Sequence, residues 1–407
     1  MKTRTERITE EITLLRVDDD RIEYFEALWK IPEGVTYNAY LLQSEGQTVL
    51  FDGWKAEYSE EFFERLCEIV KPEDIDYIVI HHMEPDHSGT LRRVLELNGY
   101  RAAVLGHPLV ERLMRAFYGL DGVKFIPVQD EEGIEIGGKK FKFVHVPWFH
   151  WPDTIFSYIE GEEILLTCDA FGGYSISDSS NDEDEEAVLA YLPYVRKYAV
   201  SVIGTYRKHI IGNIQKIIGL GMNPKMILPA HGLYWGKDPA TILNAYRDVA
   251  LGVPTKGKVV VAYGSMYGFV ERAVEAVVCE LERRGYRPKV IKFTDKHSAD
   301  VADLAIEASD SEAIVLGMST YDKKVFPLMR FATELLIEKA DYDKPVLLVS
   351  SYGWGSSVAK NVKEMFANTE LRLVDTLEFR GSSRGDGERI RKGVDSLIEG
   401  IKPPFSE

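Results

Sequence analysis

The sequence contains few cysteines, and their placement excludes two kinds of site. Only Cys67, Cys168 and Cys279 occur among the 407 residues, and they lie far apart in the chain. Three separated cysteines provide neither a disulfide framework nor a Cys-x-x-Cys motif for metal or redox chemistry. Any metal ion bound by this protein must therefore rely on nitrogen and oxygen ligands.

The sequence also lacks long apolar runs. The N-terminal segment MKTRTERITEEITLL has no uninterrupted apolar stretch of the kind found in secretory signals. No later segment approaches the roughly 18 consecutive apolar residues of a membrane span. We therefore expect a cytoplasmic protein with no membrane partner.

Positive charge is scarce as well. Lysine and arginine together number 49, against 65 aspartates and glutamates, which gives a formal net charge of −16. Such a charge repels a phosphate backbone, so nucleic acid is not expected as a partner. The acidic run NDEDEE at residues 181–186 is interpreted as a solvated loop.

The length of the chain predicts two domains, because a single hydrophobic core seldom grows to 407 residues. The segment ALGVPTKGKVVVAYG at residues 250–264 contains a Gly/Pro/Lys connection followed by a new apolar strand. We place the boundary near Pro254, which gives one domain at 1–254 and a second at 255–407.

The second half has the pattern of a doubly wound parallel sheet. Its apolar strands are KVVVAYGS, PKVIKFT, EAIVLGMST, PVLLVSSYG and LVDTLEFRG, and amphipathic segments separate them. Alternation of this kind is typical of an α/β fold with helices on both faces of the sheet. Ligands bind such sheets at the carboxyl ends of the strands.

In the first half, histidines and acids fall at or just beyond the ends of apolar strands, so separate strand ends could converge on one point. Nitrogen and oxygen donors in this number could surround two metal ions, with Asp169 as the natural bridging carboxylate because it has two oxygens. The candidate ligands are His82, Glu84, Asp86, His87, His150, Asp169 and His231.

The remaining histidines do not share this pattern. His81 still belongs to the strand and is one residue out of phase with His82, so its side chain should point to the opposite face. We expect structural roles for His107, His145 and His209, which have no ligand-like neighbours.

The motifs HHMEPDHSG, HWPDT, CDAFGG and PAHG resemble those of the flavodiiron proteins, also called type A flavoproteins. The resemblance implies a metallo-β-lactamase-like αββα sandwich followed by a flavodoxin-like domain. It implies that Asp169 bridges two irons. One iron would take His82, Glu84 and His150, and the other Asp86, His87 and His231.

A zinc hydrolase of the same first-domain fold, with an accessory flavodoxin-like domain, is the alternative. Its usual motif has a histidine where this chain has Glu84. An added carboxylate favours a harder, redox-active ion such as iron over zinc, although ligand type alone does not fix the metal.

Three loops at strand ends of the second half resemble the FMN-binding loops of flavodoxins. The first, YGSMYGFVE, has no P-loop lysine and no three-glycine dinucleotide fingerprint, so it suits a monophosphate. Many flavodiiron proteins carry Asn-Thr where this chain has Phe269-Val270, so a hydroxyl contact to the phosphate is missing. The implied FMN-binding residues are Ser265, Met266, Tyr267, Gly268, Phe269, Val270, Ser319, Thr320, Tyr321, Asp322, Ser351, Tyr352, Gly353, Trp354 and Gly355.

The resemblance implies reduction of O₂ to water, of NO to N₂O, or of both, with electrons passing through FMN to the two irons. It also implies a head-to-tail homodimer or tetramer. The chain carries neither a rubredoxin nor a flavin reductase domain, so we expect an external electron donor, either rubredoxin or reduced coenzyme F420. Tyr198 aligns with a tyrosine near the irons, where its hydroxyl could donate a hydrogen bond; a core role is the alternative.

Overall fold

The computed structural model describes residues 1–402, which divide after Arg247 into two compact units. The division falls within helix α7 (Pro239–Leu251), whereas Gly/Pro punctuation in the sequence suggests a boundary near Pro254. Glycine and proline residues mark where a helix ends, and the end of a helix need not coincide with the boundary between two hydrophobic cores. The exact domain boundary therefore stays a prediction.

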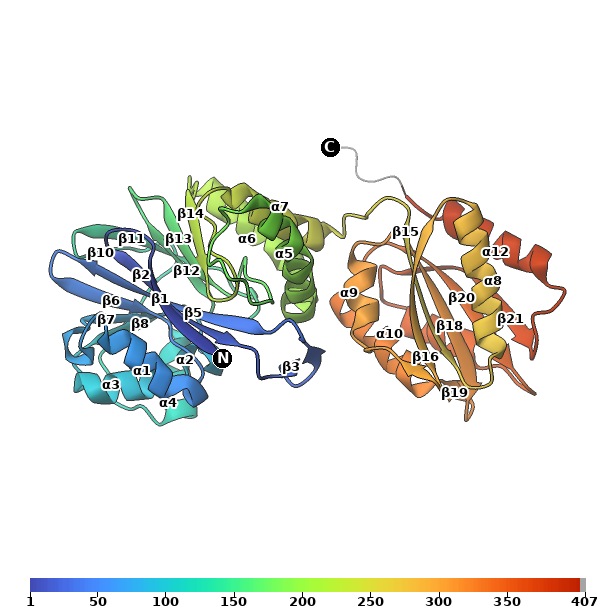
Figure 1. The fold of residues 1–407 in the computed structure, drawn as a ribbon, viewed down its shortest axis with the longest axis horizontal. Helices are drawn as coiled ribbons and strands as arrows, with labels where there is room; N and C mark the ends of the chain where they lie inside the picture. Colours follow the sequence, from blue (N-terminus) through green and yellow to red (C-terminus); the bar gives the residue numbers. More distant parts are fainter. Residues whose placement is uncertain (403–407) are drawn as a thin grey trace. The chain divides into compact units, whose positions relative to one another are not determined.

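The first unit contains two β-sheets that pack face to face (Figure 1). One sheet has the order β1-β2-β5-β6-β7-β8-β9 and the other the order β10-β11-β12-β13-β14. A separate two-stranded ribbon is formed by β3 (Tyr24–Phe25) and β4 (Trp29–Lys30). The strands of the first sheet are β1 (Lys2–Arg7), β2 (Ile12–Asp19), β5 (Val35–Ser44), β6 (Gln47–Phe51), β7 (Tyr77–Ile80), β8 (Ala103–Gly106) and β9 (Phe125–Pro127). Those of the second are β10 (Gly133–Ile136), β11 (Lys139–His145), β12 (Ile155–Ile159), β13 (Ile164–Cys168) and β14 (Met226–Pro229).

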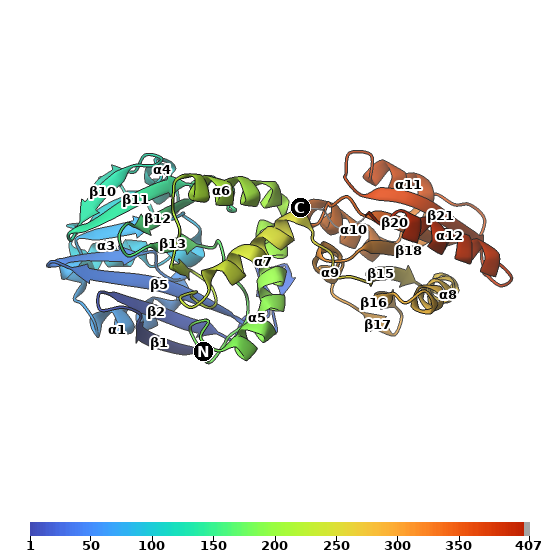
Figure 2. The same ribbon diagram turned by 90° about the horizontal axis from the view of Figure 1, so that it is seen from above.

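Helices cover the outer faces of both sheets, so the first unit has four layers (Figures 1 and 2). On the first sheet lie α1 (Ser59–Cys67), α3 (Leu91–Asn98) and α4 (Leu109–Tyr118), and on the second lie α5 (Glu185–Tyr198), α6 (Arg207–Gly219) and α7. The core between the sheets is built from alternating inward residues of both, including Leu14, Phe51, Phe141 and Leu166. This arrangement confirms the predicted αββα sandwich.

The second unit has five parallel strands with helices on both faces, as predicted from its alternating strands and helices, and two short strands, β17 and β19, pair antiparallel with them. The strand order β16-β15-β18-β20-β21 is the flavodoxin-like order 2-1-3-4-5. Helices α8 and α12 cover one face, and α9 and α10 cover the other (Figure 1). The strands are β15 (Lys258–Ser265), β16 (Arg287–Thr294), β17 (His297–Ser298), β18 (Ala313–Tyr321), β19 (Lys324–Val325), β20 (Pro345–Tyr352) and β21 (Arg372–Arg380). The helices are α8 (Phe269–Arg283), α9 (Asp303–Ser309), α10 (Pro327–Lys339), α11 (Val358–Met365) and α12 (Gly387–Glu399).

Burial on both faces explains why the central strands of this sheet are continuous apolar runs in the sequence. Strands β15, β18 and β20 lie in the centre of the sheet, where both faces are covered by helices, and nearly all of their residues are buried.

Across residues 1–402, none of the helices is both long enough and apolar enough to span a membrane.

Gly232, which follows strand β14, cannot be replaced by another residue without strain. Gly232 has a φ of +77°, and a Cβ atom placed on it would lie 1.6 Å from the hydroxyl oxygen of buried Tyr191. The backbone N–H of Gly232 donates to Thr36 Oγ1 at 2.7 Å. This close packing fixes the segment that carries His231.

We expect Gly232→Ala to destabilise the first unit more than Gly221→Ala. Gly221 has a similar φ of +72°, but a Cβ atom placed on it would have no neighbour within 4 Å, so its substitution should cost only the backbone strain of a left-handed residue, about 1–2 kcal/mol. The clash with Tyr191 should add about 1–3 kcal/mol for Gly232→Ala. Urea denaturation followed by circular dichroism measures both, and equal losses would contradict this explanation.

Candidate metal centre and flavin cavity

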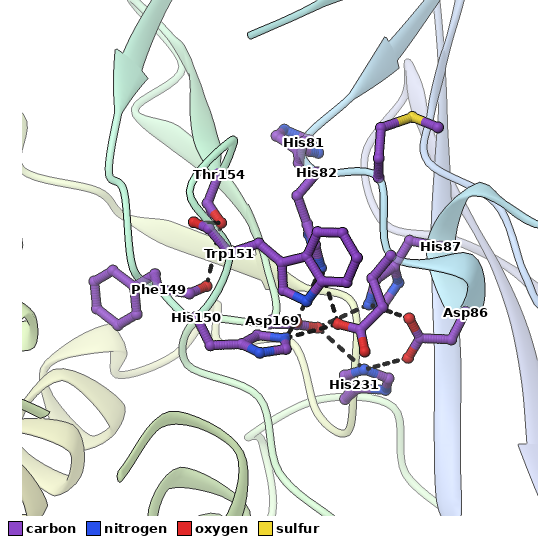
Figure 3. Close-up of polar contacts among 12 residues, drawn as sticks. His81, His82, Asp86, His87, Phe149, His150, Trp151, Thr154, Asp169 and His231 are labelled. Atoms are coloured by element: carbon purple, nitrogen blue, oxygen red, sulfur yellow. Dashed lines mark hydrogen bonds and ion pairs between the residues drawn. The ribbon is translucent and has the colours of Figure 1, made fainter. Parts of the chain in front are cut away.

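The structure brings all seven predicted ligands into one cluster, in which strand ends of both sheets take part (Figure 3). Two of the side chains, Glu84 and His150, are partly exposed, and the other five are buried. The imidazole Nε2 atoms face carboxylate oxygens in every case.

Asp169 lies at the centre of this cluster and contacts all four histidines. Its Oδ2 atom lies 2.8 Å from Nε2 of His150 and 3.2 Å from Nε2 of His82. Its Oδ1 atom lies 2.8 Å from Nε2 of His87 and 3.2 Å from Nε2 of His231. The two oxygens of one carboxylate thus face two different pairs of imidazoles.

The other two carboxylates each join one of these pairs. Glu84 Oε2 lies 2.7 Å from Nε2 of His150, and Asp86 Oδ1 lies 3.4 Å from Nε2 of His87. The cluster therefore consists of two three-residue halves that share Asp169. One half contains His82, Glu84 and His150, and the other contains Asp86, His87 and His231.

Local backbone geometry directs these side chains inward. The pairing of β13 with β14 shifts register between Leu166 and Cys168, and Cys168 has a φ of +51°. A bulge of this kind re-aims the following side chain, here Asp169. The segment around Asp86 is one helical turn, α2 (Pro85–Ser88), and Pro85 at its first position favours the helix.

The electrostatics of the cluster are those of closely paired acids and imidazoles. Burial by itself would raise the pKa of Glu84, but hydrogen bonds with His150 and His82 hold that pKa at about 2. Burial would lower the pKa of His150, yet its contacts with Asp169 and Glu84 raise that pKa to about 10. Three carboxylates in such a site need compensating positive charge, from protons or from bound cations.

Hydrogen-bonding groups at the cluster fit a bound metal. The Nδ1–H of His231 donates to the backbone oxygen of Thr36 at 2.7 Å, which directs Nε2 toward the cluster. His231 Nε2 and Asp86 Oδ1 lie close to charged partners, but among the described residues neither atom makes a hydrogen bond. Buried nitrogen and oxygen donors of this type suit iron or zinc.

The second unit contains a cavity of about 820 Å³ at the carboxyl ends of its strands. Every predicted flavin-binding residue except Gly268 lines it. Residues Tyr267 and Trp354 are 79% and 95% exposed, so they offer free aromatic surface to a planar ligand. The hydroxyl of Thr320 is buried in this lining and has no partner among the described residues.

Comparisons with known proteins agree with this pairing of a metal cluster and a cavity. Residues 35–232 match the family described as ODP family beta lactamase. A variant of the flavo di-iron protein from Thermotoga maritima is 43% identical and superposes with a TM-score of 0.93, covering 98% of this chain and 99% of that one. The chain belongs to the flavodiiron protein family.

Curated relatives carry names that fit this family. A nitric oxide reductase from Moorella thermoacetica is 28% identical over 368 residues, which are 90% of each chain. A rubredoxin-oxygen oxidoreductase from Megalodesulfovibrio gigas is 28% identical over 335 residues, which are 82% of each chain.

The remaining histidines of this flavodiiron protein lie outside the cluster. His81 points away from it (Figure 3), and its Nδ1 and Nε2 atoms contact Asp52 and Ser157 at 2.6 and 2.9 Å. His145 Nε2 bonds to a backbone oxygen at 2.9 Å, and its ring packs on His107. These contacts are structural.

Tyr198 lies beside the cluster. Its ring centroid is 5.3 Å from that of His231, and its hydroxyl is buried without a hydrogen-bond partner among the described residues. Tyr37, which was not predicted from the sequence, has the same two properties, with a ring centroid 5.3 Å from that of His231. Tyr37 lies in β5, a strand that is almost entirely buried, so its place in the sequence carries no signal of such a position.

Part of the cavity lining was also not predicted from the sequence, namely Lys323, Ser356, Ser357 and Gly381. Gly381 follows β21, the fifth strand of the sheet, and the rule that ligands bind at carboxyl strand ends could have identified it. Asp322 and Lys323 form a two-residue hairpin turn between β18 and β19, both with positive φ.

We expect Asp169→Ala to weaken iron binding at least about 100-fold, because both halves of the cluster lose their shared carboxylate. Iron content after anaerobic reconstitution and desalting measures this. Asp130→Ala is the matched control, since Asp130 is an exposed acid of the same unit that pairs with Lys216. An Asp169→Ala protein that keeps two irons would contradict the assignment, and unchanged FMN content would show that the second unit is intact.

Proposed function

We propose that this chain reduces O₂ to water, NO to N₂O, or both, at a non-haem diiron site that receives electrons through FMN. The observation that carries the proposal is the arrangement of two three-residue halves around Asp169, with Glu84 contacting His150. The aromatic-lined cavity of the second unit supports a flavin in the same chain. The family membership of the chain agrees with both.

The residues that would hold each iron follow from the two halves of the cluster. His82, Glu84 and His150 would bind one iron, and Asp86, His87 and His231 the other. Asp169 would bind both through its two oxygens. When bound, two ferrous ions and a reduced flavin supply four electrons, the number that the reduction of O₂ to two waters requires.

The tyrosine hydroxyl beside the cluster would hold a proton for this reaction. Burial raises the pKa of Tyr198 well above its usual value, and the charge of Asp169 adds to this effect, so the phenol stays protonated. A protonated hydroxyl without a partner can donate a hydrogen bond to a substrate oxygen.

Electrons would reach the FMN from an external donor, for which rubredoxin and reduced F420 are the candidates. A rubredoxin is consistent with the name of the relative from Megalodesulfovibrio gigas. We propose a head-to-tail homodimer or tetramer, in which the FMN of one chain serves the irons of another.

Two other functions are less consistent with the site. A zinc hydrolase does not require the aromatic-lined cavity of the second unit, and a simple flavin electron carrier does not require the seven-residue cluster. Purified protein with about two irons and one FMN per chain, and with NO or O₂ reductase turnover, would support the proposal. Full zinc occupancy in iron-supplemented cells, without flavin absorbance, would refute it.

We expect Tyr198→Phe to lower reductase turnover at least about tenfold, since it removes a proton donor. The same change should raise the free energy of unfolding by about 1 kcal/mol, because it removes a buried hydroxyl that has no partner among the described residues. Steady-state turnover and urea denaturation measure the two effects.

Tyr174→Phe is the matched control. Its ring lies 5.0 Å from that of Tyr198, but its hydroxyl bonds to Ser201 Oγ at 3.0 Å. This substitution should lower stability by about 1 kcal/mol and leave turnover unchanged. Full turnover in Tyr198→Phe would assign Tyr198 to core packing alone.

A further inference from the structure

The loop at residues 265–270 offers little side-chain chemistry to a phosphate. Ser265 and Tyr267 carry its only hydroxyls. Ser265 Oγ already accepts from the backbone N–H groups of Gly268 and Glu271, at 3.1 and 3.3 Å. Val270 lies in the first turn of α8 and is buried in the core, and its aliphatic side chain offers no hydrogen-bonding group to a phosphate.

The backbone of the same loop remains available. Among residues 1–402, no hydrogen bond engages the N–H groups of Tyr267, Phe269 or Val270. These groups lie at the N-terminus of α8, where the helix dipole favours an anion. They alone, however, leave the negative charge of an FMN phosphate without a counter-charge.

Arg272 is a cation in an unusual position for a helix. It lies in the first turn of α8, where the dipole disfavours positive charge, and the described part of the chain provides it with no carboxylate partner. Its guanidinium lies 4.9 Å from the ring centroid of Phe269. One of its nitrogens lies 3.0 Å from where a Cβ atom of Gly268 would be.

These contacts place the guanidinium directly beside the loop. The stacking on Phe269 holds it there, and a larger residue at position 268 would crowd it. Glu271, the acid next to Arg272 in the sequence, accepts a hydrogen bond from the hydroxyl of Tyr263 at 2.9 Å. A bound phosphate would convert the unfavourable position of Arg272 into a favourable one, because the anion would lie close to both the cation and the helix dipole.

We propose that Arg272 is a binding residue for the FMN phosphate and supplies the positive charge that the side chains of loop 265–270 lack. This inference rests on the proposed binding of FMN in the second unit. Phe269 would then be a positioning residue, because its ring holds the guanidinium of Arg272 beside the loop.

The test compares FMN with riboflavin, which has the same ring system but no phosphate. Flavin-depleted full-length protein is titrated with each ligand, and flavin fluorescence gives the Kd. We expect Arg272→Gln to raise the Kd for FMN about tenfold and to leave the Kd for riboflavin unchanged. Arg272→Lys should lose less affinity, and added salt should weaken FMN binding more in the wild type than in Arg272→Gln.

Arg283→Gln is the matched control, because Arg283 lies in the last turn of the same helix and its side chain is 61% exposed. This variant should bind FMN as the wild type does. Equal losses of FMN and riboflavin affinity in Arg272→Gln would assign Arg272 to packing and overturn the inference, as would unchanged FMN affinity. Wild-type protein that binds neither flavin would instead refute the proposed function.

Discussion

The contact of one carboxylate with four imidazoles is the constraint on which the site depends. Asp169 is buried, and its two oxygens face His82 and His150 on one side and His87 and His231 on the other. Such a group is stable only if it is compensated by cations or protons. The bulge at Cys168 and the left-handed Gly232 are therefore explained by the need to bring distant segments to this carboxylate.

Much of this arrangement could be predicted from the sequence. The candidate metal ligands come at or just after the ends of strands in the sequence. The spacing of apolar residues differs between helices and strands, so it identifies where the strands end. His81 and His82 can be distinguished because adjacent residues of a strand point to opposite faces, and the contacts of His81 with Asp52 and Ser157 agree with that argument. The doubly wound sheet of the second unit follows from its regular alternation of strands and helices.

Other features depend on packing that no local pattern reveals. Strand β2 contains the buried Arg16, which is paired with Asp18 at 2.6 Å, and a charged residue inside a strand obscures the apolar pattern. Tyr37 lies in a strand that is almost entirely buried, so no sequence pattern separates it from the core. The helical turn at Pro85 and the guanidinium stacked on Phe269 become visible only in three dimensions.

In the proposed head-to-tail assembly, the iron cluster of one chain and the FMN of its partner would act together as a four-electron catalyst of O₂ reduction. The most direct test reduces the protein fully without air, removes the reductant and titrates it with O₂ while absorbance follows the flavin and the iron. We predict that about one O₂ per chain oxidises both centres and that no hydrogen peroxide accumulates. Consumption of half as much O₂, oxidation of the flavin alone, or stoichiometric peroxide would contradict the claim.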